Sequence, residues 1–419
     1  MNIDLLIEQA EAELLTYFGD IDKIAFKNQR KVMDAFKKNR VSEMHFNPST
    51  GYGYDDIGRE TLDCVIADIF ESESAFVRSS IASGTHAITI GLFGLLRPND
   101  TMLSVTGRPY DTLTGTIGLK GGTGDIGSLM DFGVKYKQIE MRNDANAPID
   151  IDAVLREIKA DSSIKVVFVQ KSKGYQERLT IKSEQIGEVV EAVKAVNPNI
   201  YVVVDNCYGE FVEEHEPAYY GADMIIGSLI KNPGGGIAEC GGYIAGTKKA
   251  VELAAYRLTS PLVGLEVGAT LGTTKSIYKG LFYAPHTVAQ SLKIACLAAY
   301  IYEKFGYEVE PRYSDRRFDI IQTLKFNDVD KLIAFVRGIQ AGSAIDSHVI
   351  PEPSDMPGYD NKVIMASGSF TQGSSIEISA DAPIKPPYLA FMQGGLTYES
   401  GKLCIMNTLN EMSEMQSLD

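Results

Sequence analysis

The sequence lacks an excess of positive charge: its formal net charge at pH 7 is −15 over 419 residues. Proteins that bind nucleic acid without sequence preference need a basic footprint, and proteins that adhere to anionic membranes need basic patches. We therefore expect neither nucleic acid nor a membrane as a partner. A small anionic ligand remains compatible with this charge, because a local site can be positive on a negative protein.

Clustered cysteines and long apolar runs are also missing. The five cysteines are scattered, odd in number and never spaced as CxxC, so neither a zinc cluster nor a disulfide framework is indicated. There is no run of about 18 apolar residues, the length that a membrane-spanning helix needs. The acidic N-terminus has no positively charged segment of the signal-peptide kind. We expect free thiols, no metal site and a cytoplasmic location.

The pattern of hydrophobic residues predicts an α/β protein. Residues 1–59 form an N-terminal helical segment and a loop that is rich in Gly, Tyr and Asp. Short apolar runs then alternate with helical periodicity over 60–285, which indicates a large, mostly parallel sheet with helices on both faces. Residues 286–419 form a smaller C-terminal α+β domain. In the large domain the predicted strands are 74–79, 102–106, 165–169, 201–205, 224–227 and 242–245, and the predicted helices are 60–71, 85–96, 151–159, 183–195 and 248–255.

In the C-terminal domain the pattern is less regular. We predict helices over 287–304 and 328–341 and loops over 351–357 and 381–387. The predicted strands of this domain are 314–322, 345–348, 363–369 and 374–379.

Polar residues follow two of the apolar strands of the large domain and precede one of its helices. Asp205 ends YVVVD, Lys231 follows another buried strand, and Ser-Gly-Thr (83–85) stands before an apolar helix. Ligands of parallel sheets bind beyond the carboxyl ends of strands, and helix N-termini attract phosphate. Burial would lower the pKa of the lysine and free its amine as a nucleophile. Taken singly, each has an ordinary alternative: a turn aspartate, a solvated lysine or a helix cap.

Taken together, the order and spacing of these three groups resemble the fold-type-I pyridoxal phosphate (PLP) enzymes. In such a site a lysine binds the cofactor as a Schiff base, a carboxylate keeps the pyridine nitrogen protonated, and a helix N-terminus holds the phosphate. The glycine-rich run after Lys231, NPGGGIAECGGYIAG, lets the backbone pass close to a cofactor.

A narrower resemblance covers nearly the whole chain. The sequence is similar to the methionine γ-lyase/cystathionine β-lyase-like family that is often labelled "aluminium resistance protein". The motifs that carry the resemblance are SGTHAI, GRPYDTL, DNCYGEF, SLIKNPGGG, QGSSIEISADAPIKPPY and QGGLTYE.

The resemblance implies a set of site residues. Lys231 would form the Schiff base, Asp205 would pair with the pyridinium nitrogen, and Tyr110 would stack on the ring, unless it is a core aromatic residue. From the neighbouring subunit of a homodimer or homotetramer, Tyr54 (or Tyr52) and Arg59 would complete the phosphate site, unless their segment is a solvated loop. The residues implied at the phosphate are Ser83, Gly84, Thr85 and Ser228.

The sequence departs from the fold-type-I pattern at the substrate carboxylate. No arginine follows Arg337, where many of these enzymes place one. Lys385, Arg78 or Arg108 would have to serve, and a lysine cannot supply the bidentate contact of an arginine. The acidic cluster Glu210, Glu213, Glu214 and Glu216 with His215 is interpreted as a solvated turn, and Asn206 and Tyr208 are candidates for contacts with the cofactor.

The function that the resemblance implies is a PLP-dependent carbon–sulfur lyase. It would act on a sulfur-containing amino acid such as cystathionine, cysteine or methionine, by removing the α-proton and eliminating a β- or γ-thiol. Within the PLP class the alternatives are an aldolase, a racemase or an aminotransferase. Outside it they are a non-catalytic PLP-fold binding protein and a nucleotide-binding protein, although GxGxxG and Walker patterns are missing in the expected contexts.

Overall fold

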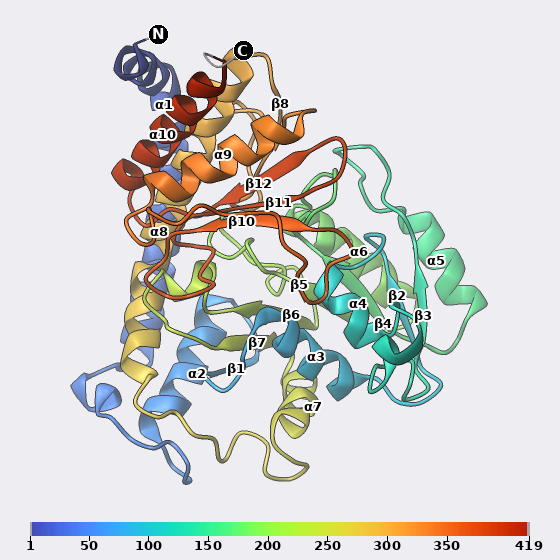
Figure 1. Cartoon of the computed structure of the whole chain (residues 1–419). Coiled ribbons are helices and arrows are strands. Elements are labelled where there is room, and N and C mark those ends of the chain that lie inside the picture. Colours follow the sequence, from blue (N-terminus) through green and yellow to red (C-terminus); the bar gives the residue numbers. More distant parts are fainter. Residues whose placement is uncertain (1, 417–419) are drawn as a thin grey trace.

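The computed structural model describes residues 2–416, which form a large sheet, a small sheet and long helices that join them (Figure 1). In the large sheet β7 is antiparallel to both of its neighbours, and all other neighbours are parallel. The α/β fold class predicted from the sequence is confirmed. In spatial order the strands are β1 (Ser74–Arg78), β7 (Gly242–Gly246), β6 (Met224–Ser228), β5 (Tyr201–Asp205), β4 (Ile164–Gln170), β2 (Thr101–Ser104) and β3 (Lys135–Gln138).

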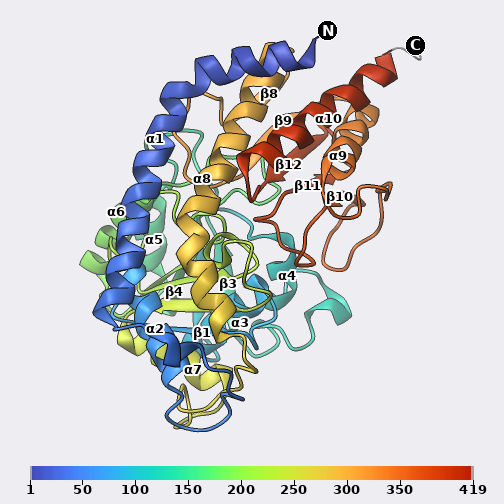
Figure 2. The ribbon, with the colours of Figure 1, turned by 90° about the vertical axis from the view of Figure 1, so that its left-hand side faces the viewer.

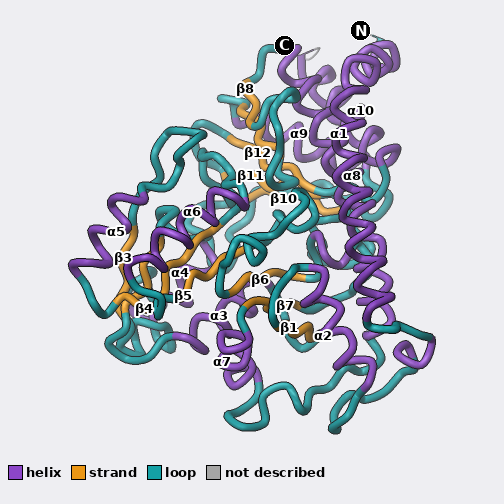
Figure 3. Tube along the Cα trace, turned by 180° about the vertical axis from the view of Figure 1, so that it is seen from behind, coloured by secondary structure: helices purple, strands orange, loops and turns teal. Residues whose placement is uncertain are grey.

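Alternate side chains of the central strands pack into separate cores on the two faces of this sheet. In β5, Val202 and Val204 belong to one core and Val203 belongs to the other. Asp205 lies two residues after Val203, so its side chain lies on the same face of the sheet as that of Val203. Helices flank the strands, as the rear view shows (Figure 3). The first core includes α2 (Ile57–Ile69), α5 (Ile151–Ala160) and α6 (Ser183–Val196), and the second includes α3 (Gly84–Leu95), α4 (Asp111–Ile117) and α7 (Lys248–Leu258).

Two long helices connect the domains. Helix α1 (Ile3–Lys38) runs beside α8 (Thr274–Lys304), and both extend from the large sheet to the small one (Figure 2). The predicted helix 287–304 is therefore only the second half of α8, and the predicted domain boundary at 285/286 falls inside it. Pro285 explains the difference, because proline favours the first turn of a helix over its interior.

The small sheet is antiparallel throughout and is covered by helices on one face. Helix α9 (Val329–Gly342) and helix α10 (Tyr398–Gln416) pack on that face, where alternate strand residues such as Ala380 and Ala382 are buried (Figure 1). The opposite face turns toward the large domain. In spatial order the strands are β10 (Val363–Ser367), β11 (Ser379–Pro383), β12 (Leu389–Gln393), β9 (Gln322–Lys325) and β8 (Glu308–Glu310).

Several predictions for this sheet are wrong. Segments 345–348 and 374–378 contain no strand, 314–322 reaches a strand only at its last residue, and the predicted loop 381–387 contains the end of β11. In the second segment the Glu377 carboxylate accepts hydrogen bonds from the backbone N–H groups of Phe370 and Thr371. This local bonding folds an alternating sequence into a loop.

None of the helices within residues 2–416 combines the length and the hydropathy that crossing a membrane requires.

Candidate active site

A cavity of about 290 Å³ lies where the carboxyl ends of β5 and β6, the N-terminus of α3 and the uncovered face of the small sheet meet. This is the edge at which parallel sheets bind ligands. The structure brings most of the predicted site residues together here, although they come from distant parts of the chain. The predicted residues that line the cavity are Ser83, Gly84, Thr85, Tyr110, Asp205, Ser228 and Lys231.

Lys231 directs its amine into this cavity. Its Nζ lies 4.1 Å from the centre of the Tyr208 ring, and a Cβ placed on Gly84 would lie 4.0 Å from Nζ. None of the hydrogen bonds or ion pairs found within residues 2–416 engages this Nζ. An amine without a fixed partner is available to form a covalent bond with a ligand.

The prediction of a lowered lysine pKa is wrong. Burial alone would lower the pKa of Lys231, but the groups around it, Cys207, Tyr208 and Asp205, raise the pKa above its ordinary value. Burial raises the pKa values of Cys207 and Tyr208 as well, so both are neutral at pH 7. Asp205 is then the group among these three that can stabilise the ammonium as a carboxylate.

Asp205 is the last residue of β5 and is only 8% exposed. Its Oδ1 accepts a hydrogen bond from the backbone N–H of Cys207 at 3.2 Å. Burial raises the pKa of this carboxyl, although the charge of Lys231 acts in the opposite direction. A buried acid that shares a cavity with a free amine is the arrangement expected of a functional site.

The N-terminus of α3 forms one end of the cavity. Ser83 is its N-cap residue and accepts a hydrogen bond from the His86 N–H at 3.1 Å, while Thr85 Oγ1 lies 2.7 Å from Thr112 Oγ1. A Cβ on Gly84 would come within 3.2 Å of Cys207 Sγ and 3.6 Å of Ser228 Cβ, so only glycine leaves this space open. Free N–H groups and hydroxyls at a helix start suit a phosphate.

Tyrosine side chains form the wall opposite. The hydroxyls of Tyr110 and Tyr359 are 2.9 Å apart, and the Tyr110 ring meets the Tyr175 ring edge to face at 5.4 Å. The Tyr110 N–H also donates to Gln170 Oε1 at 2.7 Å. Tyr359 was not predicted, because the loop that carries it shows no local pattern of a binding residue. Of the two candidates beside Asp205, Tyr208 lines the cavity.

Tyr54 and Arg59 do not reach the cavity of their own chain. Tyr54 is 70% exposed on the loop before α2. Arg59 is buried and donates to the carbonyls of Gly53, Glu266 and Gly268, which fixes this loop against the segment before α8. Their predicted roles toward a neighbouring subunit stay predictions.

The cations considered for the substrate carboxylate also lie elsewhere. Lys385 and Arg108 are exposed, and buried Arg78 pairs with Asp63 at 2.7 Å. A larger cavity of about 510 Å³ does contain cations, Lys173 and Arg178 among them. The Arg178 guanidinium, however, already donates to backbone carbonyls, including those of Leu179 and Gln170. Size alone therefore does not make that cavity the better candidate.

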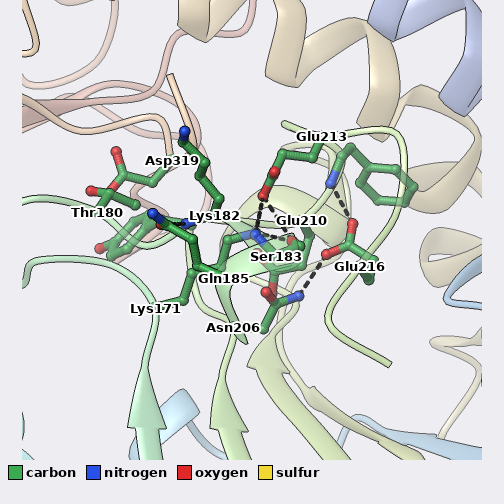
Figure 4. Close-up of polar contacts among 12 residues, drawn as sticks. Lys171, Thr180, Lys182, Ser183, Gln185, Asn206, Glu210, Glu213, Glu216 and Asp319 are labelled. Atoms are coloured by element: carbon green, nitrogen blue, oxygen red, sulfur yellow. Dashed lines mark hydrogen bonds and ion pairs between the residues drawn. The ribbon is translucent and has the colours of Figure 1, made fainter. Parts of the chain in front are cut away.

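The interpretation of Glu210, Glu213 and Glu216 as a solvated turn is wrong, because all three are buried. Figure 4 shows them among their polar neighbours. Glu213 Oε2 lies 2.9 Å from Lys171 Nζ, and Glu216 accepts from the Asn206 amide at 2.9 Å. The residues that bind these carboxylates lie on other elements, so the sequence alone does not show that the carboxylates are paired. The Asn206 side chain therefore points toward Glu216 and this network. Within residues 2–416 no group of three or more His, Cys, Asp or Glu could hold a metal ion.

Comparisons with known proteins agree with this geometry. The profile of the methionine gamma-lyase family matches residues 3–413. The Bacillus subtilis protein named "Uncharacterized protein YnbB" is 48% identical over 408 residues, which are 97% of this chain and 96% of that protein. A crystal structure named as a carbon-sulfur lyase involved in aluminum resistance, from Clostridium novyi NT, is 48% identical with a TM-score of 0.92, over 98% of this chain and 96% of that one.

A more distant structure extends the likeness in fold. It is the pyridoxal-5'-phosphate dependent protein YhfS from Escherichia coli, with 15% identity and a TM-score of 0.60, over 94% of this chain and 97% of that one. At this identity the likeness concerns the fold alone. The family match over nearly the whole length and the 48% identity of two relatives lead to one conclusion: the chain belongs to the methionine gamma-lyase family.

Proposed function

We propose that the protein is a PLP-dependent lyase that breaks the carbon–sulfur bond of a sulfur-containing amino acid. The observation that carries this proposal is the pairing of Lys231 and Asp205 in one cavity, with a free amine on the first and a buried carboxylate on the second. Membership of the methionine gamma-lyase family supports the same reaction class.

The cavity contains a complementary group for each part of PLP. The N-terminus of α3, with Ser83, Thr85 and facing Ser228, would hold the phosphate. Asp205 would accept a hydrogen bond from the protonated ring nitrogen, and Lys231 would bind the aldehyde carbon. When bound, PLP supplies an electron sink for the negative charge that develops at the substrate Cα.

The protein's own residues then position the substrate and move protons. Lys231 Nζ would be the base that accepts the α-proton, because it is the only amine among the described residues that line the cavity. Asp205, as a carboxylate, would hold a proton on the ring nitrogen. The hydroxyl of Tyr110, held by Tyr359, lines the same cavity and would orient the reacting groups. The small sheet contributes residues of β10 and β11 to the cavity wall.

The balanced reaction consumes one water. A cysteine thioether and water give a thiol, pyruvate and ammonium; a γ-thioether such as methionine gives a thiol, a 2-oxo acid and ammonium. We propose a single amino acid as the substrate and a homodimer or homotetramer as the active form, with Tyr54 acting across the interface and Arg59 holding the loop that carries Tyr54.

A substrate panel tests the proposal. PLP-loaded protein is incubated with cystathionine, cysteine and methionine, and 2-oxo acid, thiol and ammonium are measured together. A lyase releases all three in equal amounts. An aminotransferase leaves sulfur on the 2-oxo acid and releases no ammonium, whereas a racemase or an aldolase releases neither thiol nor ammonium. Any of these patterns, or no product at all, would contradict the assignment.

A further inference from the structure

The roof of the cavity is the uncovered face of the small sheet, and it carries an acidic residue. On β11, Ala380 and Ala382 point into the core beneath α9, so Ser379 and Asp381 point the other way. Asp381 pairs in register with Met365 of β10 and Phe391 of β12. The strand register therefore fixes Asp381 above the cavity, where it is one of the lining residues.

No cation pairs with this carboxylate. Its Oδ2 accepts a hydrogen bond from Gln393 Nε2 at 3.2 Å, and the same amide nitrogen donates to Ser379 Oγ at 2.8 Å. The Tyr175 hydroxyl beside it also favours the ionised form and lowers the pKa of Asp381 against the effect of burial. Among the ion pairs of residues 2–416, none includes Asp381. Asp381 is partly buried, and of the cations only Lys231 acts on its charge, so a cationic ligand beside it would gain a charge-assisted contact.

The α-amino and α-carboxylate groups, which all amino-acid substrates share, do not bind beside Asp381. The α-amino group is directed to the cofactor, at Lys231. The α-carboxylate would be repelled by a second carboxylate. Asp381 and Asp205 face only one cation, Lys231, among the described residues that line the cavity. The group left for Asp381 is on the substrate side chain, beyond the sulfur.

We propose that Asp381 is a specificity-determining residue that binds a second ammonium group, on the thiol fragment of the substrate. This inference rests on the proposed lyase function and names its substrate class: thioether amino acids whose leaving thiol carries a cationic amine. At neutral pH the carboxyl is mostly ionised, because burial raises its pKa only to about 6.

A matched pair of substrates tests this inference. S-(2-Aminoethyl)cysteine and S-propylcysteine have the same number of heavy atoms and differ by an ammonium in place of a methyl group. For the wild type we expect kcat/KM to favour the aminoethyl compound by about tenfold or more, the effect of one charge-assisted contact. In Asp381→Asn the ratio should fall to near one, while kcat/KM for the propyl compound changes little. Glu352→Gln, an exposed residue of the same domain that pairs with Arg337, is the matched control and should keep the wild-type ratio.

Binding supplies a second readout that needs no turnover. Ornithine and norleucine are a matched pair without a leaving group, and their dissociation constants are measured by calorimetry with the PLP-loaded protein. A preference for ornithine that Asp381→Asn abolishes supports the inference even if no 2-oxo acid forms, in which case the lyase proposal alone fails. Turnover of both thioethers with no preference in either assay leaves the lyase proposal standing and overturns the role of Asp381. An equal loss of both ligands in the variant also overturns it.

If Asp381→Asn does not fold, the pH dependence of ligand binding by the wild type tests the role of Asp381. The titratable groups that act on Asp381 are Tyr110, Tyr175, Tyr208 and Lys231. Burial raises the pKa values of the three tyrosines, and the pKa of Lys231 is raised too, so none of these groups titrates near pH 6. The preference for ornithine should therefore be full above pH 7 and decline as the pH falls through about 6. A preference that stays constant between pH 5 and pH 8 would contradict the inference.

Discussion

At the scale of single residues, the site depends on side chains that stand just past buried strands. Asp205 and Lys231 could be predicted because both the strand and the polar residue after it are visible in a few consecutive letters. Asp381 and Tyr359 could not, because the register of a second sheet and a distant loop bring them to the cavity. The direction of the Lys231 pKa shift was also out of reach, since it depends on neighbours such as Cys207 that only the fold assembles.

One prediction at this scale concerns Asp205. Replacing it with Asn keeps the size of the side chain but removes the charge that would hold a proton on the ring nitrogen. We expect 2-oxo acid formation to fall by about 100-fold or more, the typical effect of losing one preorganised electrostatic group. The yellow colour of bound PLP should remain, because Lys231 is intact. Steady-state kinetics and the visible spectrum check this; a variant with normal kcat would remove Asp205 from the mechanism.

At the scale of elements, most of the large sheet was predictable, but its polar edge strand β3 was missed, and in the small sheet β10 was the strand predicted with nearly its full extent. Buried parallel strands such as β4 and β5 are continuous apolar runs, and these are distinctive. Strand β8 has three residues, two of them glutamates, so its sequence resembles that of a loop. Pro285 lies inside α8, and a proline there predicts a helix that begins near it instead of one that continues through it.

The turn after Lys231 gives the prediction at this scale. Gly234 lies in a short 3₁₀ helix, Asn232–Gly234, and a Cβ there would lie 1.6 Å from the Leu229 carbonyl oxygen. Gly234→Ala should shift this turn and lower the free energy of unfolding by about 2 kcal/mol or more, in the range of overpacked cores. PLP affinity should fall with it, because the turn positions Lys231.

Gly115 is the matched control for this substitution. It lies inside α4, and a Cβ there would meet no atom within 4 Å. Gly115→Ala should leave stability unchanged or raise it by about 0.5–1 kcal/mol, since alanine favours a helix. Chemical denaturation of the two variants compares them directly. Equal effects would show that crowding at Gly234 is not the cause.

At the scale of the whole molecule, a buried polar network stabilises the large domain behind the cavity. It joins Lys171 after β4, Ser183 at the start of α6 and Glu213 in the loop after β5. The charges of Glu213 and Glu216 raise the pKa of Lys171 although burial opposes them, and Lys171 lowers the pKa of Glu213 against the same effect of burial. Each charge therefore depends on the other.

Lys171→Met should lower the free energy of unfolding by about 3–5 kcal/mol, because it leaves a buried carboxylate without its partner. Lys171→Met combined with Glu213→Gln should recover part of this loss. Since the folded pKa of Glu213 is depressed, its contribution is present above the unfolded pKa and is lost as pH falls through the folded value. The free energy of unfolding should therefore fall less steeply with decreasing pH in the double variant than in the wild type. Equal slopes in the two proteins would contradict the coupling between Lys171 and Glu213.

Oligomeric assembly gives a second prediction at this scale. Tyr54 is 70% exposed and makes no contact with the cavity of its own chain, so its replacement should leave the isolated fold unchanged. If it completes a neighbour's phosphate site, Tyr54→Ala should weaken PLP binding by about tenfold, as the loss of one hydrogen bond to a charged group does. Equilibrium dialysis measures the affinity and analytical ultracentrifugation the assembly. Unchanged PLP affinity in a sample that is dimeric would exclude this role.

The central claim is that Lys231 is the residue that binds PLP covalently, and borohydride reduction tests it most directly. Reducing the PLP-loaded protein fixes the cofactor to its lysine, and peptide mass spectrometry then identifies the modified position. We predict the pyridoxyl group on Lys231 in the wild type and no covalently retained cofactor in a folded Lys231→Ala variant. Modification of a different lysine, or a reduced wild type with no modified peptide, would contradict the account.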